Sequence, residues 1–76
     1  MNKLRDKELL LAFGTHLRIL RERKKLTLEA FALEADIEIS QVYRIEKGKI
    51  NPTLSTLNTL ASALELDLST LMNFSK

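Results

Sequence analysis

The chain has to enclose a hydrophobic core with 76 residues and without a single cysteine. A domain of this length buries roughly 60% of the surface that its unfolded chain exposes, so most of its apolar residues must share one core. The absence of cysteine excludes a disulfide framework and every thiolate metal site. We expect one domain over residues 1–76, with a short charged lead at residues 1–7.

The composition also excludes several classes of function. No apolar run approaches the roughly 20 residues that cross a bilayer, and charged residues occupy the N-terminus where a signal peptide needs an apolar stretch. We therefore expect a cytoplasmic protein without a membrane partner. One histidine and two glycines cannot build a zinc site, a nucleophile–base pair or a phosphate-binding loop. We expect neither an enzyme nor a cofactor or metal.

Charge is distributed in blocks along the chain. Eight basic and three acidic residues give residues 1–25 a net charge of +5, and four acidic residues give residues 26–43 a net charge of −4. Residues 44–52 return +2. Blocks of this kind predict one basic face, which is typical of proteins that bind polyanions and is also found on ordinary solvated surfaces.

Apolar spacing predicts an all-α fold. Leu10, Phe13, Leu17 and Leu20 recur every three or four residues, which indicates an amphipathic helix from about residue 8 to residue 24. Capping and helix-breaking residues divide the rest of the chain into shorter helices. We expect these at about 28–35, 39–47, 54–64 and 68–74. His16, at the margin of the first helix, is expected on the surface.

Residues 28–47 combine a helix, a three-residue turn and a second helix, as in helix-turn-helix DNA-binding proteins. A helical wheel places Val42 and Ile45 of the second helix inward. Polar and basic side chains occupy the opposite face. Such a face suits the major groove of DNA, and it is also the solvated face of an ordinary helix. The outward residues are Ser40, Tyr43, Arg44 and Lys47, with Ile39 and Gln41 at the margins.

Residues 13–72 resemble the lambda-repressor-like, or xenobiotic-response-element, family of helix-turn-helix regulators. The resemblance rests on FGTHLRILRERKKLTLEAFA at 13–32, SQVYRIEKGKINPTLSTLNTLASAL at 40–64 and DLSTLM at 67–72. Its most specific part is Arg44-Ile45-Glu46-x-Gly48 followed by Asn51-Pro52-Thr53-Leu54. It implies a compact five-helix domain that binds double-stranded DNA as a homodimer.

The resemblance also implies which side chains contact DNA. The helix from Ile39 becomes the recognition helix, and Arg44 on it matches the O6 and N7 acceptors of guanine. Base contacts are expected from Ile39, Ser40, Tyr43 and Arg44. Phosphate contacts are expected from Thr27, Leu28, Gln41, Lys47, Lys49 and Asn51. Family members pair a late arginine of the first helix with the glutamate that closes the recognition helix. Here these are Arg21 and Glu46, which helical wheels independently place inward.

Three positions depart from the family pattern. Leu28 stands where members often carry a phosphate-binding glutamine, and Asp36 stands where the turn often has glycine. Glu38 precedes the recognition helix, where serine or threonine often caps it. Leu28 and Glu38 weaken the expected contact with phosphate.

The C-terminal residues carry more apolar side chains than one small core needs, and we expect some of them to form a dimer surface. These are Leu66, Leu68, Leu71, Met72 and Phe74. The leading hypothesis is therefore a bacterial or phage regulator, such as a repressor, that binds an inverted-repeat operator as a homodimer. The alternative is an antitoxin or adaptor that binds a toxin or other partner protein, with DNA binding secondary or lost. Phage repressors, restriction–modification controllers and antitoxins all fit the sequence.

Overall fold

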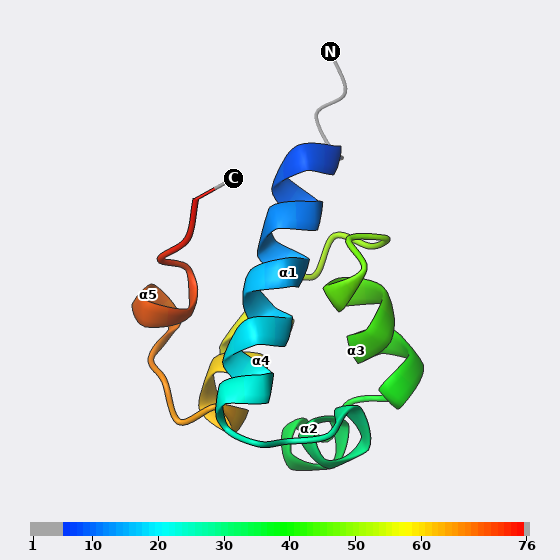
Figure 1. The fold of residues 1–76 in the computed structure, drawn as a ribbon, viewed down its shortest axis with the longest axis vertical. Helices are drawn as coiled ribbons and strands as arrows, with labels where there is room; N and C mark the ends of the chain where they lie inside the picture. The colour runs from blue at the N-terminus through cyan, green and yellow to red at the C-terminus, as the bar shows by residue number, and fades with distance from the viewer. Residues whose placement is uncertain (1–5, 76) are drawn as a thin grey trace.

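Helices form most of residues 6–75, the part of the chain that this computed structural model describes (Figure 1). The all-α prediction is confirmed over these residues. Each of the first four helices begins and ends within one residue of its predicted position; residues 1–5 of the predicted lead lie outside the described part. The helices are α1 (Lys7–Arg23), α2 (Leu28–Ala35), α3 (Ile39–Glu46), α4 (Leu54–Ala63) and α5 (Leu68–Leu71).

The last helix is shorter than the predicted 68–74, because tertiary packing replaces its final turn. The chain leaves the helix after Leu71, and the ring of Phe74 stacks on His16 with 5.3 Å between the centroids. Phe13 lies against the same ring at 5.5 Å. His16 Nε2 also donates a hydrogen bond to the Leu71 carbonyl oxygen over 2.8 Å. The expectation that His16 is a surface residue is therefore wrong: it is half-buried and anchors the C-terminal segment.

Side-chain caps begin four of the five described helices. Asp6, Thr27, Thr53 and Asp67 each accept a hydrogen bond from the backbone N–H three residues further on. Such a cap contributes about 1 kcal/mol to stability. The exception is α3, where Glu38 occupies the cap position and its side chain makes no such bond.

The ends of α1 to α4 share one backbone geometry. In each case a left-handed residue follows the helix, and the next amide bonds to the carbonyl five residues back. This Schellman arrangement satisfies carbonyl groups that the helix leaves without partners. The left-handed backbone at Asp36 confirms the predicted turn and explains why glycine also suits that position. The residues are Lys25, Asp36, Gly48 and Glu65, with φ of 62°, 55°, 70° and 61°.

All five helices contribute to one hydrophobic core. Figure 1 shows α1 in the centre, with α3 on one side and α5 on the other. The buried apolar side chains are Leu10, Phe13 and Leu17 of α1, Phe31, Ala32 and Ala35 of α2, Val42 and Ile45 of α3, Leu60 and Ala61 of α4, Leu64 after it, and Leu71 of α5.

The backbone of α1 approaches the C-terminal end of α3 too closely for any side chain to lie between them. A Cβ on Gly14 would lie 2.3 Å from the Glu46 carbonyl oxygen and 2.6 Å from that of Ile45. A Cβ on Gly48, directly after α3, would lie 2.9 Å from the Cα of Leu11. Both glycines of the chain therefore serve one contact, the one that holds the end of α3 against α1.

A bidentate ion pair fastens the same end of α3. Arg21 donates from Nε and Nη2 to the Glu46 carboxylate over 2.7 and 3.1 Å, and from Nη1 to the Leu26 carbonyl oxygen over 2.9 Å. The two charged side chains are only 12% and 5% exposed. The hydrogen bond to Glu46 raises the pKa of Arg21 against the effect of burial, so the guanidinium stays charged. The predicted pair thus joins α1, the loop before α2 and α3.

Substituting Gly14 tests the close contact between α1 and α3. Alanine raises helix propensity by about 1 kcal/mol, but its methyl group meets backbone atoms that cannot rotate away. We expect Gly14→Ala to lower the free energy of unfolding by about 1–3 kcal/mol in chemical denaturation. Thr15→Ala, at an exposed position of the same helix, should change it by less than about 0.5 kcal/mol. A Gly14→Ala variant as stable as the wild type would contradict the contact.

Removing Glu46 tests the ion pair. Glu46→Ala leaves the Arg21 guanidinium largely buried and unpaired, which costs about 3–5 kcal/mol for a fully buried pair. Because Arg21 keeps some exposure, we expect the lower end of this range. The matched control is Glu22→Ala, which removes the exposed pair between Arg18 and Glu22 and should cost less than about 1 kcal/mol. Equal melting temperatures for the two variants would show that the buried pair does not stabilise the fold.

Candidate nucleic-acid interface

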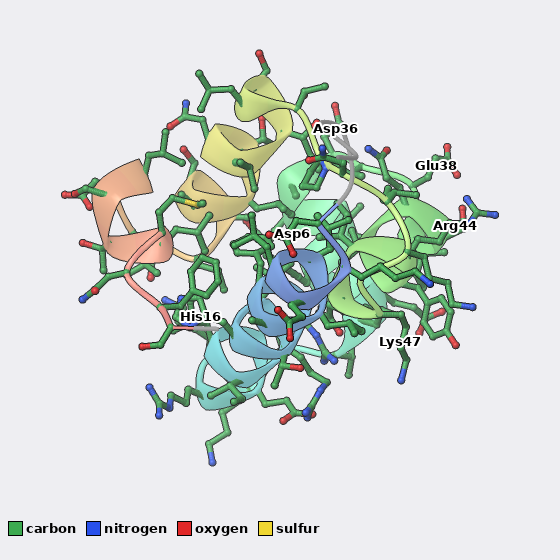
Figure 2. The ribbon with its side chains drawn as sticks, turned by 90° about the horizontal axis from the view of Figure 1, so that it is seen from above. Asp6, His16, Asp36, Glu38, Arg44 and Lys47 are labelled. Atoms are coloured by element: carbon green, nitrogen blue, oxygen red, sulfur yellow. The ribbon has the colours of Figure 1, made fainter. Side chains whose placement is uncertain are left out.

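The third helix has one buried face and one exposed face, as the helical wheel predicts. Val42, Ile45 and Glu46 are buried against the core. Ile39 is exposed and Gln41 is half-buried at the margins of the outward face. Figure 2 shows Arg44 and Lys47 projecting away from the molecule beside α3. The exposed side chains at the centre of this face are Ser40, Tyr43, Arg44 and Lys47.

Two of these side chains form a pair on the helix surface. The Lys47 ammonium lies 5.6 Å from the centroid of the Tyr43 ring, one helical turn earlier. A cation–π contact at an exposed site is worth about 0.5–1 kcal/mol. The contact holds the lysine stem along the helix, while the guanidinium of Arg44 forms no ion pair with any residue of 6–75. Arg44 is therefore available to a ligand.

The predicted phosphate contacts lie at both ends of the helix-turn-helix. At the start of α2, the Thr27 hydroxyl oxygen accepts from the Ala30 amide over 3.0 Å, and Leu28 packs half-buried against the core. Leu28 can therefore offer an anion only its backbone amide, at the positive end of the α2 dipole. Lys49 and Asn51 are exposed in the loop that follows α3. The start of α2 thus offers backbone amides, and the loop after α3 offers basic and amide side chains.

Negative charge lies at the beginning of the same helix. Asp36 and Glu38 are both exposed, on either side of Ile37. Figure 2 shows the Glu38 side chain projecting outward on the α3 side of the molecule. The exposed face therefore carries an acidic start and a basic end.

The structure corrects the predicted dimer surface at one residue, Leu71. Leu71 has no exposed surface because it fills the core, so it cannot contact a second chain. Leu66, Leu68 and Phe74 are half-buried against the core, whereas Met72 is 39% exposed. Met72 and Phe74 line an apolar groove of about 160 Å³ together with Leu9, Leu10, Phe13, Asn51, Pro52 and Leu57.

Leu9, which is 42% exposed at the rim of this groove, was not among the predicted interface residues. It lies within the apolar run from Leu9 to Phe13, but outside the stripe that Leu10 and Phe13 begin. Its place off that stripe is the signal that it points outward, and the structure agrees, since Leu10 is buried and Leu9 is not.

Residues 6–75 contain neither a membrane-spanning helix nor a cluster of metal-binding side chains. No described helix is both long and apolar enough to cross a membrane. No group of three or more histidine, aspartate or glutamate side chains within residues 6–75 is placed to hold a metal ion.

Comparisons with known proteins agree with this geometry. The family model described as a helix-turn-helix domain matches residues 12–72. The HTH-type transcriptional repressor RghR of Bacillus subtilis (strain 168) is 39% identical over 62 residues, which is 80% of this chain and 46% of that protein. The immunity repressor protein of Bacillus phage phi105 is 34% identical over 59 residues, 78% of this chain and 41% of that protein. This chain spans less than half the length of both relatives.

A solved structure matches over nearly its whole length. The restriction-modification controller protein C.AhdI from Aeromonas hydrophila superposes with a TM-score of 0.83 at 34% identity, covering 86% of this chain and 98% of that one. The family match covers more than half of the chain, and the fold agrees with it over all five described helices. The chain therefore belongs to the lambda-repressor-like family of helix-turn-helix transcriptional regulators, which is not a family of enzymes.

Proposed function

We propose that this protein regulates transcription by binding a specific double-stranded DNA sequence with α3 in the major groove. The observation that carries the proposal is the exposed face of α3, which is polar and basic and whose Arg44 has no ion-pair partner among residues 6–75. The major groove is wide enough to admit a helix, and each base pair presents a distinct pattern of donors and acceptors there. A regulator of this kind acts on DNA in the bacterial cytoplasm.

Base recognition is assigned to side chains at the centre of the exposed face and to Ile39 at its margin. The Arg44 guanidinium pairs with O6 and N7 of guanine, a contact that discriminates by about 1–3 kcal/mol. Ile39 and the Tyr43 ring offer apolar surface to a thymine methyl group. The Ser40 hydroxyl can donate to or accept from several different bases, so it adds affinity with little preference for one base.

Phosphate contacts position the helix without selecting sequence. On the side after α3 we assign them to Lys47, Lys49 and Asn51, and on the margin of α3 to Gln41. At the start of α2 the backbone amides of Thr27 and Leu28 point along a helix dipole that attracts an anion. Binding of this kind raises affinity for every duplex and weakens as salt rises.

The protein is proposed to act as a homodimer. Two copies that join by a two-fold axis present two α3 helices to half-sites whose centres lie about 34–36 Å apart, or a multiple of that, on an inverted repeat. We assign this interface to the apolar groove, because Met72 and Leu9 at its rim expose more apolar surface than the fold requires. Leu66, Leu68 and Phe74 lie half-buried in the same C-terminal region. Occupancy of the operator would then exclude or recruit RNA polymerase.

The same groove favours a second candidate function. An antitoxin or adaptor would use it to bind a toxin or another partner protein, with DNA binding secondary. The two functions differ in their dependence on DNA: a regulator loses affinity for duplex DNA steeply as salt rises, whereas an adaptor that has lost DNA binding has no such affinity to lose.

Base-reading and phosphate-binding residues give opposite results on substitution. After selection of the preferred site from random duplexes, Arg44→Ala should flatten the preference at one guanine of each half-site. Lys49→Ala should instead weaken binding to every sequence alike and lower the salt slope by about one. Binding to the selected site and its single-base variants at several salt concentrations measures both. If Arg44→Ala loses affinity equally on every variant, Arg44 contacts phosphate and the proposed orientation of α3 is wrong.

A charge placed at the groove should separate the dimer. We expect Met72→Glu to sediment as a monomer where the wild type is a dimer, and to lose about 100-fold or more in affinity for an inverted repeat because the two half-sites no longer bind together. Ile19→Glu is the matched control, because Ile19 is 37% exposed on α1 and does not line the groove. A monomeric wild type that also selects a non-palindromic site would contradict the dimer.

A further inference from the structure

The carboxylate of Glu38 is not used by the fold. The other four described helices begin with a side chain that accepts from an early amide of its helix, but the Glu38 side chain makes no such bond. It forms no ion pair with any residue of 6–75, and it is exposed. A charged group directly before the exposed helix is thus left to meet a ligand that binds there.

Glu38 and Arg44 project outward on the same side of the molecule (Figure 2). Their positions differ by six residues, which corresponds to about 9 Å along a helix axis. Base pairs are stacked about 3.4 Å apart, so this distance spans two to three base steps. When the axis of α3 runs along the stack of base pairs, a helix that places Arg44 on a guanine places Glu38 over a base pair two or three steps away.

A carboxylate at that place needs a hydrogen-bond donor. The phosphates around it are negative, and bringing an unpaired charge out of water into the groove is costly. The amino group N4 of cytosine is a donor in the major groove that a glutamate accepts well. Guanine presents two acceptors there, and thymine presents an acceptor and a methyl group, so both leave the carboxylate unpaired. Adenine offers an amino group beside an acceptor, and glutamine matches that pair better than glutamate does.

We propose that Glu38 is a specificity-determining residue, whose carboxylate accepts from cytosine N4 at a C·G pair two or three steps from the guanine that Arg44 contacts. The proposal rests on the proposed function, because it requires α3 to lie in the major groove. The departure of Glu38 from the small polar caps of the family then has a physical role. With glutamate at this position α3 lacks a side-chain cap, and in the proposed complex the carboxylate selects one base.

A simpler role for Glu38 gives different results. A negative charge at the start of α3 also complements the helix dipole. In that case its removal lowers the melting temperature and relieves repulsion from phosphate, so affinity rises by the same factor for every sequence. Selection of a base, by contrast, changes the order of preference among sequences.

The test compares base preferences of the wild type, Glu38→Ala and Glu38→Gln on the selected site and its single-base variants. The wild type should prefer cytosine by about tenfold or more at the stated distance from the guanine that is lost in Arg44→Ala. Glu38→Ala should remove this preference, and Glu38→Gln should move it toward adenine. Glu34→Gln is the matched control, because Glu34 lies on α2 in a groove with the ends of α1 and α4, and should change no preference. Melting curves establish that each variant is folded.

Three results would overturn the proposal. A wild-type site without a C·G pair two or three steps from that guanine contradicts it before any variant is made. Unchanged cytosine preference in both Glu38 variants contradicts it, as does an equal gain in affinity on all sequences. Failure of the proposed function is distinguishable from these outcomes: the wild type would then show no sequence preference, and Arg44→Ala would change nothing.

Discussion

The close approach of α1 to the C-terminal end of α3 determines how the exposed helix is presented. Reading bases by hydrogen bonds requires side chains to be held within a fraction of an ångström, so the helix that carries them must be fixed to the core. Here the two glycines let the backbones of α1 and of the end of α3 meet, and the pair between Arg21 and Glu46 ties the same two helices. The glycines and the ion pair therefore hold the same end of α3 against α1.

The two ends of α3 are stabilised in different ways. Its C-terminal end has a buried ion pair, a left-handed glycine and a Schellman bond from Lys49 to the Arg44 carbonyl oxygen. Its N-terminal end lacks the side-chain cap found at every other described helix. Natural proteins tend to violate local rules for stability at sites that serve function. The C-terminal end therefore fixes α3 to the core, and the uncapped N-terminal end leaves the charged Glu38 side chain exposed.

The local sequence pattern predicted the helices, and tertiary packing determined the contacts between them, which that pattern does not show. Spacing of apolar residues and capping residues such as Thr27 and Thr53 located four helices, because these signals act within a few residues. They could not indicate that Gly14 lies against the end of α3, since a glycine inside a helix shows no partner in sequence. The wrong assignment of Leu71 to the dimer surface has the same cause. Periodicity indicates which face of a helix is apolar, but not whether a neighbouring helix covers that face. Within the candidate site, the helical wheel predicted the exposed face of α3. Only the structure showed that the Glu38 side chain makes no cap hydrogen bond to that helix.

The mixture of charges on this face bears on how the proposed regulator would select one DNA site. Lysine contacts to phosphate strengthen binding to every duplex, so they add as much to the competing non-specific sites as to the operator. A carboxylate in the groove acts in the opposite direction, because it is repelled wherever no donor meets it. Under the proposed contacts of Arg44 on α3 and of Glu38 just before it, wrong sequences leave both a cation without its acceptors and an anion without its donor. Discrimination then grows faster than affinity, and it is the ratio of specific to non-specific binding that determines occupancy of an operator.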